Sequence, residues 1–291
     1  MGDTIVPLTR RRGAARFGEH EVVSPLARGG MGGVYLAEHV DTGERVALKV
    51  LDPQFANHPE VVARLHSEAE LAARAKHPGL LDIRAARRSS DDVPYLVMEY
   101  LSGETLGAIA DRGEIDQALA IAICAQAASA LAALHDAGVV HCDVKPENVF
   151  VCDDTIGGWP RVKVIDFGVS RPVEELPDGV TIAGTPWCMA PEQWHGRPQT
   201  ASDVYALGCV LYDLITGHPP FDGSLPELML AHLEQRPARP SWFARVPLAL
   251  ERVILWSLAK DPVHRPTMAE LASELTRLAD GLAPDELRAV G

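Results

Sequence analysis

The stretch His141-Cys142-Asp143-Val144-Lys145-Pro146-Glu147-Asn148 concentrates acidic, basic and amide side chains in one polar turn. The tripeptide Asp166-Phe167-Gly168 follows less than twenty residues later. Short apolar runs flank both stretches: Val139-Val140, Val149-Phe150-Val151 and Val162-Lys163-Val164-Ile165. Apolar runs of this length that end at Gly, Pro or Asp are typical of short buried strands. We therefore expect the polar side chains to lie on turns between buried strands, where they can converge on one point.

The chemistry of these side chains indicates one class of reaction. One aspartate can accept a proton from an incoming hydroxyl group, and Lys145 can neutralise charge on a phosphoryl group in transit. Asn148 and Asp166 offer oxygen atoms, which are the ligands that hard divalent cations prefer. Together these groups form a complete set for phosphoryl transfer, where catalysis depends mostly on positioning and electrostatics.

Each piece alone is typical of an ordinary turn, so the order and spacing of the pieces carry the interpretation. His-x-Asp-x-x-x-x-Asn, then Asp-Phe-Gly, then Ala190-Pro191-Glu192 is the ordered motif set of protein kinases. The chain resembles that family over roughly residues 20–278. Among its members, it is most similar to the eukaryotic-like (Hanks-type) serine/threonine protein kinases of bacteria.

The resemblance implies an α+β, protein kinase-like fold of two lobes, one a small antiparallel sheet with one helix and the other larger and mainly helical. ATP would lie in the cleft between them. We expect a flexible lead-in at 1–19, a kinase domain at 20–278 and a C-terminal tail at 279–291. Within the domain, the small lobe would cover 20–98, the hinge 99–103 and the large lobe 104–278.

Composition limits the partners and the compartment. The net charge of −13 argues against nucleic-acid binding, which needs a basic surface. We expect no membrane span, because no apolar stretch is judged to approach the eighteen or so residues required, and no secretory signal is visible. The five cysteines are odd in number and contain no Cys-x-x-Cys pair. A reduced, cytoplasmic chain without disulfides or zinc is the expectation.

A glycine-rich turn lies between two apparent strands at residues 27–36. Glycines allow backbone amides to approach phosphate oxygens closely. The family pattern Gly-x-Gly-x-x-Gly-x-Val is matched by Ala27, Gly29, Gly32 and Val34, so the first glycine is replaced. An alanine methyl group is tolerable there if the backbone is extended.

The next strand, Arg45 to Leu51, carries Ala47 and Lys49 of the family's Val-Ala-Ile-Lys motif, whose lysine holds the α- and β-phosphates. The resemblance assigns Glu68, on a helix expected from about Pro59, as the partner of this lysine. Glu60 and Glu70 are the competing candidates.

Residues 92–101 resemble the last strand of the small lobe and the hinge. The resemblance implies that backbone groups of Glu99 and Leu101 bind the adenine edge and that Met98 borders the pocket. As a bare sequence, this segment is only a strand.

In the catalytic turn, the resemblance implies that Asp143 is the base and that Lys145 stabilises the phosphoryl group during transfer. It also implies that Asn148 and Asp166 bind Mg²⁺ (or Mn²⁺). A lysine two residues after the aspartate is the serine/threonine pattern, so Ser and Thr hydroxyls of proteins would be the acceptors. The resemblance leaves self-phosphorylation open.

Cys142 replaces the arginine that usually follows this histidine and that grips a phosphate on the activation segment. We therefore predict that activity does not depend strongly on phosphorylation between Gly168 and Ala190, a segment that offers Ser170, Thr181 and Thr185. A redox pair of Cys142 and Cys188 is the less favoured alternative, because buried cysteines behave mostly as small apolar residues.

Family resemblance also gives structural roles to three residues. Asp203 would hold the backbone of the catalytic turn, and Arg265 would pair with Glu192. Trp187, beside the expected peptide-binding segment, is either a substrate contact or a packed aromatic residue.

Two other functions compete with an active protein kinase. A pseudokinase that binds nucleotide or a partner without transfer is supported only by Ala27, Cys142 and the small residue Ala72 on the helix of Glu68. A small-molecule kinase is disfavoured by Gly184-Thr185-Pro186 and Ala190-Pro191-Glu192, which resemble a peptide-binding segment.

Overall fold

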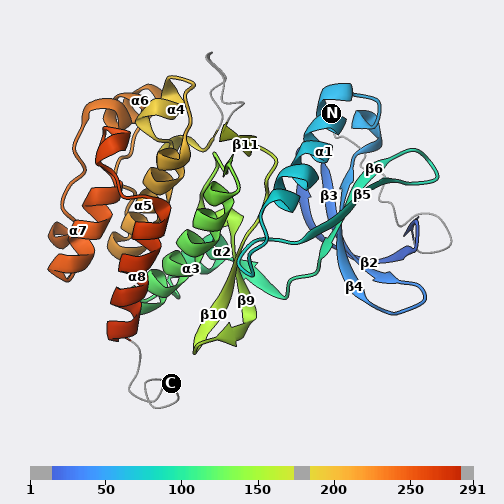
Figure 1. The fold of residues 1–291 in the computed structure, drawn as a ribbon, viewed down its shortest axis with the longest axis horizontal. Helices are drawn as coiled ribbons and strands as arrows, with labels where there is room; N and C mark the ends of the chain where they lie inside the picture. The colour runs from blue at the N-terminus through green and yellow to red at the C-terminus, as the bar shows by residue number, and fades with distance from the viewer. Residues whose placement is uncertain (1–14, 174–183, 283–291) are drawn as a thin grey trace. The chain divides into compact units, whose positions relative to one another are not determined.

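The computed structural model describes residues 15–173 and 184–282 and divides the chain into two compact units (Figure 1). Among the described residues, the first unit comprises 15–73 together with 82–101, and the second comprises 74–81, 102–173 and 184–282. The first is a sheet with one helix and the second is mainly helical. The expected α+β kinase-like fold is therefore confirmed.

The first unit is built on a six-stranded antiparallel sheet with the strand order β1-β2-β3-β4-β6-β5. The sequence produces it through short runs of β-branched and aromatic residues that alternate with polar ones. Helix α1, Pro59–Arg74, belongs to the same part of the chain and begins with proline, which suits a first helical turn. The strands are β1 Arg16–Phe17, β2 His20–Gly29, β3 Gly32–His39, β4 Arg45–Leu51, β5 Ile83–Arg88 and β6 Pro94–Glu99.

One core cluster holds this sheet together and includes Phe17, Leu48 and Tyr95. Phe17 is 5% exposed, and its ring lies edge-on to Tyr95 at 5.2 Å between centroids. Residues 15–19 were expected to belong to a flexible lead-in, but β1 pairs with β2 and buries Phe17. This part of the lead-in is therefore part of the sheet; the rest of it lies outside the described residues.

The second unit is organised around α3, Gln117–Asp136, which packs against α5, α8 and β10 (Figure 1). Asp116 caps the start of α3 by accepting a hydrogen bond from the Leu119 N–H at 2.8 Å. Alanine predominates on α3 and permits close packing of the neighbouring helices. The other helices are α2 Leu106–Asp111, α4 Pro191–Trp194, α5 Thr200–Thr216, α6 Leu225–Glu234, α7 Leu248–Ser257 and α8 Met268–Leu282.

Short strands frame the motif-bearing turns of this unit. The described residues of this unit form two small antiparallel sheets, a three-stranded one in the order β10-β9-β7 and a two-stranded one of β11 and β8. Gly157 and Gly158 join β9 to β10 with φ values of 59° and 80°, which favours glycine at both positions. Residues 153–160 therefore form the end of a β-hairpin. These strands are β7 Gly103–Thr105, β8 Val139–Val140, β9 Val149–Ile156, β10 Trp159–Val164 and β11 Arg171–Pro172.

Two boundaries differ from those expected. Residues 74–81 group with the second unit rather than with the small lobe, because the Leu81 N–H donates to the Val164 carbonyl and the Val164 N–H donates to that of Gly79. Helix α8 extends to Leu282, past the expected start of the tail at 279.

The expectation that no stretch is long and apolar enough to span a membrane is wrong for α3. A window of 18 residues within this 20-residue helix reaches a mean hydropathy of 1.8, which meets the criterion of length and composition. A share of 61% of that window is buried inside the protein, and the buried residues of the helix include Ile121, Ile123 and Leu131. A buried core helix of a soluble domain meets the same criterion, so α3 is weak evidence for a membrane span.

Candidate active site

The catalytic turn, residues 141–148, is held from behind by Asp203 of α5. Its carboxylate accepts the backbone N–H of His141 at 2.8 Å and that of Cys142 at 2.9 Å. The expected structural role of Asp203 is thereby confirmed. His135 of α3 adds a third contact, with Nε2 2.8 Å from Oδ2 of Asp203. No motif in the sequence includes this histidine, which lies in the last turn of α3.

His141 and Phe167 are both buried, and their ring centroids are 5.7 Å apart. Nε2 of His141 lies 3.2 Å from the Ile165 carbonyl. These contacts tie the catalytic turn to the Asp-Phe-Gly turn, so both rings act in packing, as expected. Asp166 itself has a φ of 63°, a left-handed conformation that is uncommon for a residue with a side chain.

Asp143 lies at the centre of a compact polar cluster. Its Oδ2 is 2.7 Å from Nζ of Lys145, and its Oδ1 accepts a hydrogen bond from the Thr185 hydroxyl at 2.8 Å. Nζ of Lys145 also donates to the Thr185 hydroxyl oxygen at 3.2 Å. Nδ2 of Asn148 donates to the Asp143 carbonyl at 2.8 Å. Asp143 is 7% exposed, so these charge-assisted contacts lie in a largely desolvated place.

Thr185 is the residue whose contacts the sequence did not predict. From the sequence we named it as a phosphorylation candidate and as part of the segment that resembles a peptide-binding site, but its hydroxyl also bridges Lys145 and Asp143. Its position immediately after Gly184, in a segment already thought to face the peptide, was the available signal.

Lys145 remains protonated in this environment. Burial alone would lower its pKa, but the hydrogen bond and charge of Asp143, together with the charges of Glu147 and Asp166, outweigh burial and raise the pKa. The ammonium group is therefore a fixed positive charge beside Asp143, the form that would neutralise a transferring phosphoryl group.

Asn148 and Asp166 fit a divalent cation by the chemistry of their donor atoms. Because Nδ2 of Asn148 is committed to Asp143, its side-chain oxygen is the atom that faces any ligand. Oδ1 of Asp166 accepts the Gly168 N–H at 3.3 Å, a long contact. Among residues 15–173 and 184–282, no cluster of three or more His, Cys, Asp or Glu side chains is suited to a metal ion. A cation here would therefore need further ligands, such as phosphate oxygens, which is common for Mg²⁺.

In the first unit, Lys49 of β4 contacts Glu68 of α1. Nζ lies 2.7 Å from Oε1 and 2.8 Å from Oε2, and Glu68 is 3% exposed. The competing candidates Glu60 and Glu70 are both exposed. Of the three glutamates, Glu68 is thus the one brought to Lys49.

The glycine-rich turn joins β2 to β3, and Ala27 pairs with Val34 in this ladder. The backbone at Ala27 is extended, so its methyl group meets the condition stated for tolerance. At Gly32, an added Cβ would lie 2.0 Å from the Val50 carbonyl oxygen, so only glycine fits beside β4. The described residues place no such constraint on Gly29, since the nearest of their atoms to an added Cβ is 4.0 Å away.

The expected adenine contacts lie at the end of β6. Met98 pairs with Ala47 of β4, and both residues are buried. The Glu99 N–H donates to the Asp82 carbonyl at 3.0 Å, so this N–H is already engaged. Leu101 is half-buried just beyond the strand.

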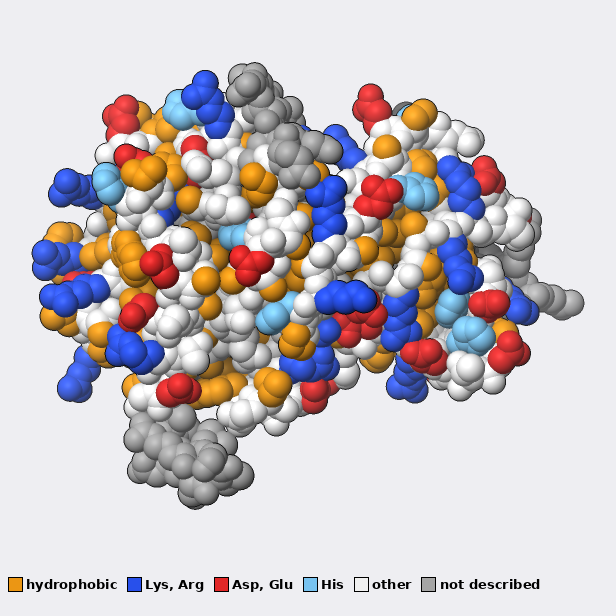
Figure 2. Space-filling view, viewed as in Figure 1, with side chains coloured by type: hydrophobic (Ala, Val, Ile, Leu, Met, Phe, Trp, Pro, Cys, Tyr) orange, Lys and Arg blue, Asp and Glu red, His pale blue; other side chains and the backbone are white. Residues whose placement is uncertain are grey.

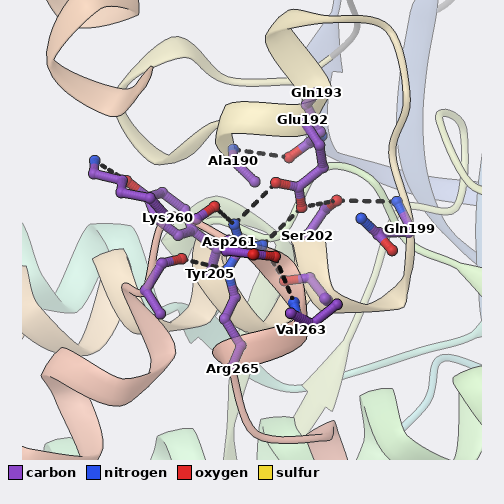
Figure 3. A network of polar contacts seen from close by, with 12 residues as sticks. Ala190, Glu192, Gln193, Gln199, Ser202, Tyr205, Lys260, Asp261, Val263 and Arg265 are labelled. Atoms are coloured by element: carbon purple, nitrogen blue, oxygen red, sulfur yellow. Dashed lines mark hydrogen bonds and ion pairs between the residues drawn. The ribbon is translucent and has the colours of Figure 1, made fainter. Parts of the chain in front are cut away.

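Glu192, of the Ala190-Pro191-Glu192 motif, forms a bidentate ion pair with Arg265 (Figure 3). The two guanidinium nitrogens of Arg265 lie 2.7 Å from Oε1 and 2.9 Å from Oε2 of Glu192. The Ser202 hydroxyl also donates to Oε1 of Glu192 at 2.6 Å. The predicted partnership of Arg265 and Glu192 is therefore confirmed. The neighbouring Gln193 donates to the Cys142 carbonyl at 3.0 Å and links this network to the catalytic turn.

All five cysteines are buried free thiols. Burial raises the pKa of Cys142, with the nearby charge of Asp203 contributing, and burial raises the pKa of Cys188 well above its usual value. Thiols that resist ionisation are poor nucleophiles. The redox alternative for Cys142 and Cys188 therefore has no support in their surroundings.

In the second unit, an aspartate beside a fixed lysine, with an amide and a carboxylate suited to a cation, has the chemistry of a phosphotransferase site. The first unit separately carries a glycine-rich turn and a lysine of β4 paired with a glutamate of α1. Residues 20–275 match the protein kinase domain family. The chain belongs to the protein kinase domain family, as its motifs had indicated.

Curated relatives agree with this assignment. The chain is 38% identical over 278 residues to serine/threonine-protein kinase PknB of Mycolicibacterium smegmatis, covering 91% of this chain and 44% of the relative. It is 40% identical over 257 residues to Pkn1 of Myxococcus xanthus, covering 86% and 36%. It is 37% identical over 259 residues to PrkC of Bacillus subtilis, covering 87% and 39%. The chain thus spans less than half the length of these relatives.

Proposed function

We propose that this chain is an active serine/threonine protein kinase that transfers the γ-phosphoryl group of ATP to protein hydroxyls. The observation that carries the proposal is the cluster of Asp143, Lys145 and Thr185, which is preassembled within hydrogen-bond distance. The names of the similar serine/threonine-protein kinases support the choice of acceptor.

In this proposal, Asp143 accepts the proton of the acceptor hydroxyl and Lys145 stabilises charge on the phosphoryl group. Lys49, held by Glu68, binds the α- and β-phosphates, and the backbone of the glycine-rich turn lies over them. We assign the adenine to Ala47, Met98 and the backbone of Glu99 and Leu101. At the glycine-rich turn, the residues that we assign to the nucleotide are Ala27, Gly29, Gly32 and Val34.

Asn148 and Asp166 are the proposed ligands of Mg²⁺. When bound, the cation would neutralise charge on the phosphates. The contribution of the chain is to orient these two oxygens: Asn148 through its bond to the Asp143 carbonyl and Asp166 through its turn with Gly168.

Cys142 supports a further part of the proposal, namely that activity does not require a phosphate on the activation segment. Its buried side chain replaces an arginine and offers no cation to such a phosphate. Ser170 is buried and donates to the His141 carbonyl, so it is a poor acceptor site. Thr181 lies outside the described residues.

Five buried, free thiols also favour a reducing compartment, and we assign the chain to the cytoplasm.

The deciding experiment is γ-phosphoryl transfer from Mg²⁺-ATP to the protein itself and to a generic protein substrate, with Asp143→Asn as the control. Loss of the base should reduce transfer by roughly a hundredfold or more while ATP still binds. Phosphoserine or phosphothreonine in the product would establish the acceptor. Absence of transfer by the unmodified protein, with intact ATP binding, would instead favour a pseudokinase.

A further inference from the structure

A basic stretch interrupts this acidic chain between residues 235 and 260. It holds Arg236, Arg239, Arg245, Arg252 and Lys260 against one acidic residue, Glu251, although the whole chain carries a net charge of −13. The stretch covers the 3₁₀ helix η6, Pro240–Trp242, and all of α7.

Glu251 does not neutralise the surface around it. It is 6% exposed, and its Oε2 accepts the Ser241 N–H at 2.9 Å. Hydrogen bonds from Ser241 lower its pKa, with the charge of Arg239 contributing, so the carboxylate is ionised and committed. The same hydrogen bond fastens η6 beside α7, which brings the side chains of both elements onto one surface.

The four arginines are all exposed. Within the two described ranges of the chain, none of the four forms an ion pair or a side-chain hydrogen bond. Their guanidinium groups are therefore available to a partner, which is unusual beside the ion-paired arginines elsewhere, such as Arg112 with Glu104 and Glu114.

Large apolar side chains project between these arginines. Trp242 is 73% exposed, Phe243 51% and Leu248 61%. Leu248, Arg252 and Trp256 follow at four-residue spacing along one face of α7. We call the resulting region the arginine–tryptophan surface, formed by Arg239, Trp242, Phe243, Arg245, Leu248 and Arg252. In Figure 2, basic and hydrophobic side chains alternate at the left edge, where Figure 1 draws α7.

The exposed apolar area is large for a free surface. Trp242, Phe243 and Leu248 together leave on the order of 350 Å² in contact with water, which is within the range of the largest patch on a typical monomer. Patches of this size, rimmed by polar residues, often mark interaction sites.

The composition of this surface matches one kind of partner. Trp, Phe and Arg are enriched in protein–protein interfaces, Lys is depleted, and Trp and Arg dominate their binding energy. A guanidinium group also pairs with a carboxylate in a planar, bidentate geometry that lysine cannot make. We propose that the arginine–tryptophan surface docks an acidic segment of a protein substrate that carries apolar side chains. The inference rests on the proposed function, which requires protein partners.

An anionic lipid surface is the rival occupant, and electrostatics favours the protein segment. A bilayer extends beyond the patch on every side, so its charge would also act on the rest of the chain, and the whole chain carries a net charge of −13. A single polypeptide segment meets only the charges within a Debye length of roughly 8–10 Å, where the arginines predominate.

Direct binding tests the inference independently of catalysis. The probe is fluorescein-labelled dephosphorylated casein, an acidic protein with apolar side chains, and anisotropy is measured on the Asp143→Asn background without ATP. Arg239→Glu/Arg252→Glu should raise the Kd at least about tenfold, and Trp242→Ala about fivefold. All three positions are exposed, so the variants should keep the thermal midpoint of the parent within a few degrees.

Matched controls separate docking from general charge and hydrophobicity. Arg87→Glu/Arg88→Glu on β5 makes the same charge change, and Ile156→Ala, at 56% exposure, removes a comparable apolar side chain. Both should leave the Kd unchanged. Casein that fails to bind the parent, or that binds all variants equally, would overturn the inference. So would variants that bind casein normally but lose sedimentation with phosphatidylglycerol vesicles, an outcome that would assign the surface to a membrane.

Discussion

The hydroxyl of Thr185 donates a hydrogen bond to Oδ1 of Asp143 at 2.8 Å, across 42 residues of sequence. The same hydroxyl accepts from Nζ of Lys145 at 3.2 Å, so it closes a ring with the Lys145–Asp143 ion pair. The segment expected to face the peptide is thereby fastened to the proposed base. The conformation of this segment and the orientation of the Asp143 carboxylate therefore depend on each other.

Thr185→Ala should reduce kcat by roughly ten- to a hundredfold, because Asp143 loses a partner that fixes its orientation. Steady-state transfer to a peptide substrate measures the effect. Thr185→Ser keeps the hydroxyl and should retain most of the activity. Equal loss in both variants would show that the methyl group, rather than the hydrogen bond, is what matters.

Glu68→Gln should weaken the hold on Lys49 and reduce kcat/KM for ATP by roughly tenfold or more, since the buried amide offers no charge to the lysine. Glu70→Gln, exposed on the same helix, is the matched control and should behave as the parent. Isothermal titration with an ATP analogue would separate binding from turnover. A similar loss in Glu70→Gln would contradict the assignment.

The fold and most of the site were predictable because they depend on local spacing. The catalytic turn, the Asp-Phe-Gly turn and the glycine-rich turn each lie within a few residues of sequence, and resemblance to a family supplies their order. Glu68 could be preferred to Glu60 and Glu70 by counting back from the His77-Pro78 stop that follows its helix. The contacts that could not be predicted join residues far apart, such as His135 with Asp203 and Gln193 with Cys142, where nothing local marks the partner.

The burial of Phe17 and the apolar character that lets α3 meet the membrane-span criterion escaped prediction for a different physical reason. A two-residue strand carries too little periodicity to be recognised, and its position is decided by the ring of Tyr95 on β6, a strand that does not neighbour β1 in the sheet. Helix α3 is apolar around most of its circumference because several elements surround it, a pattern that composition alone cannot distinguish from a membrane span.

Arg265→Met should lower the free energy of unfolding by about 3–5 kcal/mol, because it leaves the Glu192 carboxylate buried without its counter-ion. The double variant Glu192→Met/Arg265→Met should lose less, since no uncompensated charge remains. Urea denaturation of the three proteins measures the difference. Additive losses would indicate that the two side chains act independently.

His232 should make stability fall in mild acid. Burial lowers its pKa to about 4, with the positive charge of Lys260 contributing, and Nδ1 lies 2.9 Å from the Tyr205 hydroxyl. The unfolded chain binds a proton near pH 6.5 while the folded chain does not, so stability contributed by the neutral ring is lost between about pH 6.5 and 4. The total is on the order of 3 kcal/mol.

The measurement is the free energy of unfolding across that pH range for the parent and for His232→Gln, which does not titrate. The difference between the two curves isolates the histidine from the carboxylates that titrate in the same range. The advantage of the parent over the variant should shrink as the pH falls. A difference that stays constant with pH would contradict the assigned pKa shift.

Phosphorylation of the activation segment should matter little, because Cys142 provides no cation at the position where relatives carry an arginine. Thr181→Ala should keep kcat within about threefold of the parent, and phosphatase treatment should have an equally small effect. Thr185→Ala serves as the contrast, since that threonine acts through its hydroxyl contact with Asp143 rather than through a phosphate. If Thr181→Ala remained folded yet lost nearly all transfer, another cation would have to take the place of the missing arginine. Arg171 would then be the first residue to replace, because it lies close enough to Cys142 for its charge to lower the pKa of that thiol against the larger effect of burial.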